Sequence, residues 1–147
     1  MKKSVGIIPY KIVGKSQKDS KYYFFVGHPG GWTREWWSLL KGGAEGDEDE
    51  IETALREFKE ESGVDLSEER NNLVYLGIVQ QNKEKKVAAF AINYPDIDPS
   101  KCFSNLIEDG VTPEIDRYCW MEFEKLEPLT HPAHIPFYKK IMGVECK

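Results

Sequence analysis

The sequence has few cysteines, no long apolar run and no excess of positive charge. Its three cysteines, Cys102, Cys119 and Cys146, have no C-x-x-C spacing, so they predict neither a disulfide framework nor a zinc site. They indicate reduced thiols in a reducing compartment. The basic start, residues 1–3, is followed by an apolar stretch that breaks at Pro9, so neither a signal peptide nor a membrane span is expected. These absences make the cytoplasm the expected location.

The charge balance also disfavours two classes of partner. The 147 residues include 20 Lys and Arg against 25 Asp and Glu, which gives a net charge of -5. General binders of nucleic acid or of anionic membranes need clustered Lys and Arg, so neither partner is expected. An acidic protein can still take a polyphosphate if metal ions supply the positive charge.

No repeat, low-complexity tract or linker divides the chain, so residues 1–147 are expected to form a single domain. Apolar, β-favouring runs predict strands at residues 4–13, 22–27, 73–80, 86–94 and 115–122. Residues 36–40 are interpreted as a further short strand that leads into a loop at residues 41–43. A closing helix is expected at about residues 136–142. Strands before and after a helix predict a mixed sheet with helices against it.

The clearest element is a helix predicted over residues 49–62. Asp49 with Glu52 three residues later resembles an N-terminal capping pair, and Gly63 is typical of a helix end. Apolar residues at i, i+3, i+4 and i+7 predict its buried stripe: Ile51, Ala54, Leu55 and Phe58.

Three glutamates share one face of this helix, because Glu57, Glu60 and Glu61 fall at i, i+3 and i+4. That face borders the buried stripe, so the acids should lie near the rim of the core, where like charges repel unless protons or cations intervene. Arg56 can reach Glu60 and offset one charge. Hard oxygen ligands without nearby His or Cys favour Mg²⁺ or Mn²⁺. A merely solvated, glutamate-rich helix face is the alternative interpretation.

The spacing of the whole segment decides between these interpretations. Gly42 is followed after five residues by Glu48, and after seven more residues by REFKEESGV at residues 56–64. This pattern is a complete match to the Nudix signature, so the chain resembles a Nudix hydrolase. The HPGG segment at residues 28–31 and the PEIDR segment at residues 113–117 are similar to a bacterial subgroup of that family. The resemblance therefore covers most of the chain.

The resemblance implies an α/β/α sandwich around a central mixed sheet. It also implies metal-assisted attack of water on a diphosphate linkage in a nucleoside diphosphate derivative, such as a nucleoside triphosphate or a dinucleoside polyphosphate. Glu57, Glu60 and Glu61 become the expected metal-binding acids, and the Gly42 backbone carbonyl becomes a further ligand. Arg56 would orient the cluster by an ion pair. Mg²⁺ is the expected cofactor, with Mn²⁺ as the alternative.

The carboxylate that accepts the proton from water stays open. Glu60 within the signature and Glu114 in a later loop are the two candidates for the general base. Glu114 could equally be a fourth metal ligand or only the residue that begins the next strand. The alternative function is a non-catalytic Nudix-fold sensor that binds a nucleotide without cleaving it, and the intact acidic set argues against it.

The loop before the signature supplies the candidate substrate-binding residues. Lys41 is the preferred phosphate contact, because the loop brings it beside the acids. Arg34 could also meet phosphate, although a solvated surface charge is the favoured interpretation. Trp32 and Trp36 are candidates for stacking on a nucleobase, at even weight with ordinary packing, whereas Trp37 is expected in the core.

No residue indicates which nucleotide is the substrate. Residues 80–82 (QQN) lie where some Nudix hydrolases carry a tyrosine or proline that marks their substrate, and neither marker is present. His131 and His134 are interpreted as part of a polar turn and not as a metal site, because no third ligand is near. The expected partner is a small, phosphorylated, nucleotide-like molecule, and the expected state is a monomer or a homodimer.

Overall fold

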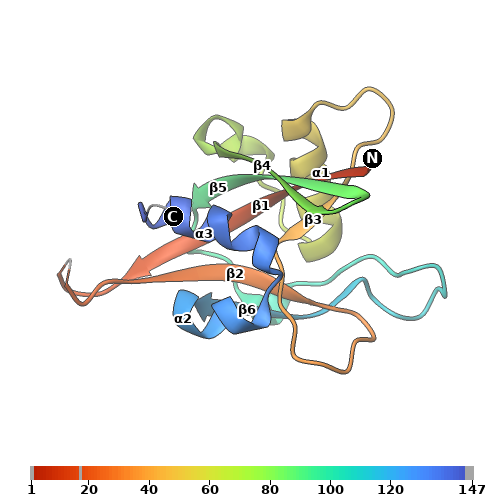
Figure 1. The fold of residues 1–147 in the computed structure, drawn as a ribbon. Helices are drawn as coiled ribbons and strands as arrows, with labels where there is room; N and C mark the ends of the chain where they lie inside the picture. Colours follow the sequence, from red (N-terminus) through yellow and green to blue (C-terminus); the bar gives the residue numbers. More distant parts are fainter. Residues whose placement is uncertain (1, 17, 145–147) are drawn as a thin grey trace.

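The computed structural model describes residues 2–16 and 18–144. It contains a six-stranded sheet with helices on both faces (Figure 1). The strands are β1 Lys2–Val13, β2 Lys21–Pro29, β3 Leu40–Gly43, β4 Val74–Asn82, β5 Lys85–Asn93 and β6 Ile115–Glu122. The α-helices are α1 Glu50–Ser62, α2 Phe123–Leu126 and α3 Ile135–Ile141. The 3₁₀ turns are η1 Ser67–Asn72, η2 Pro99–Lys101, η3 Glu127–Leu129 and η4 Pro132–His134.

β1 lies at the centre of the sheet, whose strand order is β4-β5-β1-β2-β6. β5 pairs parallel with one edge of β1. The other edge of β1 is divided: residues 4–7 pair antiparallel with β3, and residues 10–13 pair antiparallel with β2. Helix α1 packs against both β1 and β3. This arrangement brings the start of the Nudix-like signature in β3 directly against the helix that carries its acids.

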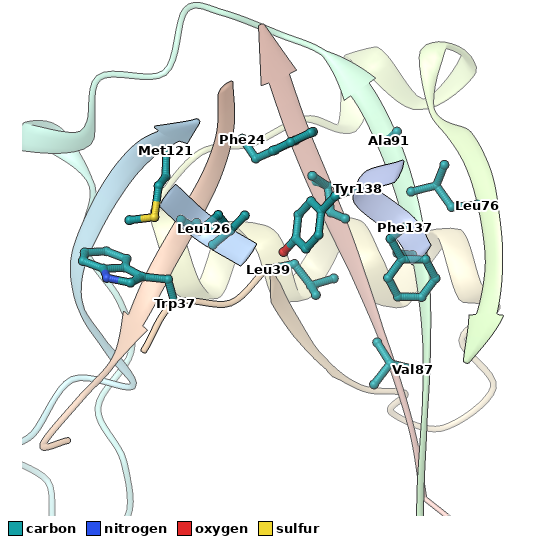
Figure 2. Close-up of a cluster of buried hydrophobic side chains, with 13 residues drawn as sticks. Phe24, Trp37, Leu39, Leu76, Val87, Ala91, Met121, Leu126, Phe137 and Tyr138 are labelled. Carbon is teal, nitrogen blue, oxygen red and sulfur yellow. The ribbon is translucent and has the colours of Figure 1, made fainter. Parts of the chain in front are cut away.

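Two clusters of buried side chains lie on opposite faces of the sheet. Alternation along β1 sends Val5 and Ile7 to the face covered by α1, and Ile8 to the face covered by α3. On the α3 face, Phe137 and Tyr138 pack among apolar side chains of the strands, as Figure 2 shows. Both faces of the sheet are therefore covered. The expected α/β/α sandwich with a central mixed sheet is confirmed.

The central helix begins and ends where the sequence predicts. Asp49 Oδ1 accepts a hydrogen bond from the Glu52 backbone N–H at 2.8 Å, and Gly63 forms the C-cap. The predicted stripe faces the core: Ala54, Leu55 and Phe58 are buried, and Ile51 packs against them. Burial of this stripe fixes which face of α1 is turned outward, and so fixes the position of its glutamates.

One predicted strand is misplaced. The sequence favours a strand at residues 36–40 and a loop at residues 41–43, and this prediction is wrong because β3 occupies Leu40–Gly43. Glycines disfavour a strand in isolation, but pairing with β1 and packing under α1 stabilise the extended backbone here. Trp37 is buried as expected, although a backbone hydrogen bond to Leu129 and not a strand ladder holds it.

No helix within residues 2–16 and 18–144 combines the length and apolar character needed to cross a membrane. Cys102 and Cys119 are free thiols, and burial raises the pKa of Cys102 to about 11. Cys146, the third cysteine of the sequence, lies outside the described residues.

Candidate active site

Gly42 packs so closely against Glu57 that no side chain fits at position 42. A Cβ atom built on Gly42 would lie 2.1 Å from Cδ of Glu57, far inside van der Waals contact. Any larger residue would force β3 away from α1 or turn the Glu57 carboxylate aside. The first glycine of the signature is therefore required by the packing of the first acid of the cluster.

Arg56 is the centre of an ion-pair network. Its Nε and Nη2 donate to the two carboxylate oxygens of Glu48 at 2.7 and 3.0 Å. Its Nη1 donates to Glu57 Oε1 at 2.9 Å and to Glu60 Oε2 at 3.0 Å. Nη2 also donates to the Gly43 carbonyl at 2.7 Å. The predicted Arg56–Glu60 contact is present, and the guanidinium also ties the acids to the segment before α1.

The fork of hydrogen bonds between Arg56 and Glu48 is the strongest electrostatic contact of this network. The guanidinium lowers the pKa of Glu48 to about 2, so that carboxylate stays ionised at neutral pH. Because Glu48 shares the guanidinium with two acids of the helix, it helps to hold Arg56 in place between them. This contact gives a structural reason for Glu48, which is separated from Gly42 by five residues.

Glu61 is the buried acid of the cluster, with 7% of its surface exposed. Its Oε1 accepts a hydrogen bond from the Lys41 backbone N–H at 3.0 Å. Burial and a hydrogen bond with Glu114 raise the pKa of Glu61 to about 9. Two carboxyl groups share a hydrogen bond only when one of them is protonated. The Glu61–Glu114 pair therefore holds a proton at neutral pH, in a position where a cation would take its place.

The oxygen donors of this cluster suit a divalent cation, but they are not gathered around one point. Burial raises the pKa of Glu57 as well, so repulsion among the acids favours a bound cation. Arg56 engages Glu57 and Glu60, however, and no three His, Cys, Asp or Glu residues of the described chain are arranged to hold a metal ion. Arg56 contacts only one carboxylate oxygen of Glu57 and one of Glu60, so the second oxygen of each remains available to a cation.

A cavity of about 250 Å³ lies beside the acidic cluster, with Glu61 in its wall. Segments far apart in the sequence line it: the loop between β2 and β3, β3 itself, the β4–β5 hairpin and the turn before α3. The lining residues include Trp32, Trp36, Lys41, Lys85, His131 and His134. We call this cavity the basic pocket.

Lys41 and Lys85 place two positive charges in the basic pocket. Burial, and then repulsion by the nearby Lys85 ammonium, lower the pKa of Lys41 to about 8. Glu61 and Glu57 act on Lys41 in the opposite direction but do not cancel these effects. An anion bound between the two ammonium groups would relieve their repulsion.

Trp32 and Trp36 form an aromatic wall of the pocket. The Arg34 guanidinium lies over both indoles, with its Cζ 4.3 Å from the ring centroid of Trp36 and 5.9 Å from that of Trp32. His131 meets Trp36 edge to face, with the ring centroids 6.5 Å apart. Arg34 is exposed, which agrees with the interpretation of a surface charge. Its guanidinium is nevertheless stacked on the indoles of Trp32 and Trp36.

Comparison with known proteins identifies the family. The NUDIX domain model matches residues 15–141. The chain belongs to the Nudix family. The mRNA-decapping enzyme subunit 2 of Saccharomyces cerevisiae is 29% identical over 102 residues, which cover 69% of this chain and 10% of that protein. The chain thus spans about a tenth of the length of the curated relatives it matches.

Two solved Nudix structures show the same fold. The C. elegans Ap4A hydrolase binary complex superposes with a TM-score of 0.64 at 19% identity, over 97% of this chain and 99% of that chain. The NUDIX domain of Shewanella oneidensis NrtR, complexed with ADP ribose, gives 0.65 at 12% identity, over 97% and 88% of the two chains. Family and fold agree with the expectation of a Nudix pyrophosphohydrolase.

The structure brings the predicted residues of the Nudix signature together. Glu57, Glu60 and Arg56 are joined by hydrogen bonds, and Glu114 joins them through Glu61 although it lies far along the sequence. Lys41 connects the two regions, because its backbone contacts Glu61 and its side chain lines the basic pocket.

Other residues of the pocket were missed by sequence reasoning. Lys85 and Gln81 carry no local motif, and strand pairing between β4 and β5 brings them to the pocket. His134 does lie in the predicted turn, but it is buried, with its Nε2 2.7 Å from Gln81 Oε1. Burial lowers the pKa of His134 to about 3, so its ring is neutral. The turn interpretation is right and yet incomplete, because the turn forms a wall of the pocket.

Proposed function

We propose that this Nudix protein hydrolyses a diphosphate linkage in a small, nucleotide-like substrate with the help of a divalent cation. Mg²⁺ is the proposed cofactor and Mn²⁺ the alternative. The observation that carries the proposal is the cluster of four carboxylates, Glu57, Glu60, Glu61 and Glu114, beside a pocket with two lysines. Family membership supports pyrophosphate hydrolysis in general.

The carboxylates of Glu57, Glu60 and Glu61 and the Gly42 carbonyl would hold the cation. A bound cation would neutralise the diphosphate and lower the pKa of an attacking water. Arg56 holds Glu57 and Glu60 on one face of α1 when no cation is present, and so keeps them close to where they are needed. Its role is positioning.

Two carboxylates are candidates for the proton acceptor. Glu60 lies at the open side of the cluster, and Glu114 shares a hydrogen bond with Glu61. Loss of the general base lowers kcat and removes the acidic limb of its pH profile, whereas loss of a metal ligand is partly overcome by more cation. Comparison of Glu60→Gln with Glu114→Gln across pH and Mg²⁺ concentration therefore separates the two roles.

The basic pocket would bind the substrate next to the reacting phosphorus. Lys41 and Lys85 would contact phosphate oxygens, which offset the repulsion between their ammonium groups. Trp32 and Trp36 would stack on the base, and a base there would displace or cover the Arg34 guanidinium. Arg34 would then turn toward a phosphate.

A substrate panel tests this proposal. It should include a nucleoside triphosphate, a diadenosine polyphosphate, ADP-ribose and a methylated cap dinucleotide, since the similar proteins bear such names. We expect at least one compound to be cleaved at a diphosphate linkage, only with a divalent cation, and mass spectrometry of the products identifies the linkage. Absence of turnover of every compound by correctly folded protein would overturn the proposal.

A nucleotide sensor is the second candidate function. It would use the lysines and indoles of the basic pocket to bind a nucleotide that the acidic cluster leaves uncleaved. The sensor predicts binding of a nucleotide by calorimetry without any product. The cytoplasm remains the proposed compartment, and a monomer or a homodimer the proposed state, which light scattering distinguishes.

A further inference from the structure

His28, in the HPGG segment, is a buried histidine that faces two hydrogen-bond acceptors. Its ring is 1% exposed, with Nδ1 2.7 Å from Asp116 Oδ1 and Nε2 2.8 Å from the Arg34 backbone carbonyl oxygen. The Arg34 carbonyl oxygen can only accept, so this contact is a hydrogen bond when Nε2 carries the hydrogen.

The HPGG and PEIDR segments form one packed unit around this pair. The Gly30 backbone N–H donates to the Glu114 carbonyl at 2.8 Å. A Cβ atom on Gly30 would lie 1.7 Å from the Pro113 carbonyl oxygen, so only glycine allows the two segments to approach this closely. These contacts fix the end of β2, which carries His28, against the start of β6.

The loop that His28 reaches has little support of its own. Residues 31–36 have no helix or strand, and they carry Trp32, Arg34 and Trp36. Glu35 contacts the Trp37 Nε1–H at 3.1 Å and Arg117 at 3.2 Å, but the Arg117–Glu35 pair is at the exposed surface. At the middle of this loop the buried His28 ring contacts the Arg34 carbonyl, and near its end Trp36 meets His131 edge to face.

We propose that His28 is a positioning residue whose Nε2–H donates to the Arg34 carbonyl and thereby fixes Trp32 and Trp36 as a wall of the basic pocket. This inference rests on the proposed function, since it takes the pocket as the nucleotide site. The charged groups around the ring are Asp116 and Arg117 of β6 and Glu35 of the loop, and Trp37 packs against it edge to face. A loop ordered in advance loses less entropy when substrate binds, so the effect falls on KM.

Two substitutions separate the two hydrogen bonds of the ring. In His28→Gln the amide N–H₂ reaches the position of Nε2 and can still donate to the Arg34 carbonyl. In His28→Asn the amide N–H₂ stands near the position of Nδ1 and keeps only the contact with Asp116. We expect His28→Asn to raise KM about tenfold with kcat within about twofold, and His28→Gln to stay close to wild type in both.

Fluorine NMR of protein labelled with 5-fluorotryptophan observes the loop without any substrate. We expect the Trp32 and Trp36 resonances of His28→Asn to narrow and to approach the position of solvent-exposed indole, because the loop becomes mobile. The Trp120 resonance is the control, since its indole N–H donates to the Ile97 carbonyl, away from the loop. An unchanged Trp120 resonance establishes that the variant is folded.

A third measurement needs no variant. Nitrogen NMR of the His28 ring in the wild-type protein should show hydrogen on Nε2. An Nε2 without hydrogen would overturn the inference, and so would equal KM values for His28→Asn and His28→Gln with unchanged loop resonances. Failure of the proposed function looks different: the wild type then turns over no substrate, while the two NMR experiments still report on His28.

Discussion

The acidic cluster and the basic pocket lie side by side, but they are held in different ways. Three of the acids lie on α1, where the Gly42 contact and the hydrogen bonds of Arg56 hold them, and Glu114 joins them through Glu61. The pocket is assembled from several distant segments, and one of them is a loop without regular structure. The two regions are connected by a hydrogen bond of 3.0 Å, which the Lys41 backbone N–H donates to Glu61 Oε1.

We propose that the acidic cluster carries out the reaction and that the basic pocket recognises the substrate. A site on a rigid helix holds its groups in fixed geometry, whereas loops on such a scaffold can vary and so determine what is bound. Changes in the cluster should therefore act mainly on kcat, and changes in the pocket mainly on KM. Substitutions in the two regions therefore differ in which kinetic constant they change.

Glu61→Gln should have the largest effect. The amide keeps the volume and can still accept from the Lys41 N–H, but it lacks the charge that would bind a cation. We expect kcat/KM to fall on the order of 10³-fold with Mg²⁺, measured on the best substrate of the panel. Glu52→Gln, an exposed acid in the first turn of the same helix, is the matched control. If Glu61→Gln turned over substrate as fast as the wild type, the acidic cluster would not be the site of the reaction.

Arg56→Gln should reduce kcat by about 10- to 100-fold, because Glu57 and Glu60 lose the group that orients them. Arg56→Lys should recover only part of this loss, since an ammonium group cannot contact Glu48, Glu57 and Glu60 in one planar fork. Steady-state kinetics give kcat for both variants. Lys59→Gln, on the other side of α1, is the control. An effect confined to KM would contradict a positioning role for Arg56.

Lys85→Gln should raise KM about tenfold and leave kcat nearly unchanged, since it removes one charge-assisted contact to phosphate. Lys86→Gln is a close control, because Lys86 is the exposed neighbour on the same strand. Kinetics with the same substrate as above give both constants. A loss of kcat equal to the rise in KM would show that the pocket takes part in the reaction, and the separation would fail.

The pH dependence of stability should show the smallest effect. The pKa of Glu61 is raised from 4.5 to about 9, so its contribution to stability is complete below pH 4.5 and declines as pH rises toward 9. We expect the metal-free protein to melt at least about 3 °C higher at pH 5 than at pH 7.5. The lowered pKa of Lys41 acts oppositely, but only above about pH 8.

Calorimetry of the wild type and of Glu61→Gln, both in chelator, checks this prediction. The variant should lose most of the difference between the two pH values, because its amide does not titrate. Added Mg²⁺ should raise the wild-type melting temperature at pH 7.5 more than at pH 5, since protons compete with the cation. An equal pH dependence in both proteins would show that Glu61 is not the titrating group.

The acidic cluster was predictable from the sequence because helix geometry alone places residues i, i+3 and i+4 on one face. The caps Asp49 and Gly63 are local signals as well, so the bounds of α1 follow from neighbouring residues. The contact of Arg56 with Glu60 follows from the same spacing. Its contacts with Glu48 and the Gly43 carbonyl depend on how the preceding segment folds back.

The basic pocket was only partly predictable, because tertiary pairing creates it. Lys85 lies near Lys41 because β5 pairs with β1 and β1 pairs with β3. No local sequence pattern predicts this proximity. The strand at residues 40–43 was misplaced for a similar reason, since the two glycines of β3 are extended only because β1 and α1 support them. Lys41, Trp32 and Trp36 line one cavity because the loop between β2 and β3 leads directly into β3.

Binding of Mn²⁺, followed by electron paramagnetic resonance in a titration without substrate, shows which of the two regions holds the cation. The wild type should bind Mn²⁺, Glu57→Gln should bind it at least about tenfold more weakly, and Lys85→Gln should bind it as the wild type does. This outcome assigns the cation to the acidic cluster and leaves the basic pocket for the substrate. Undiminished Mn²⁺ binding by Glu57→Gln, or equal weakening by Lys85→Gln, would contradict the account.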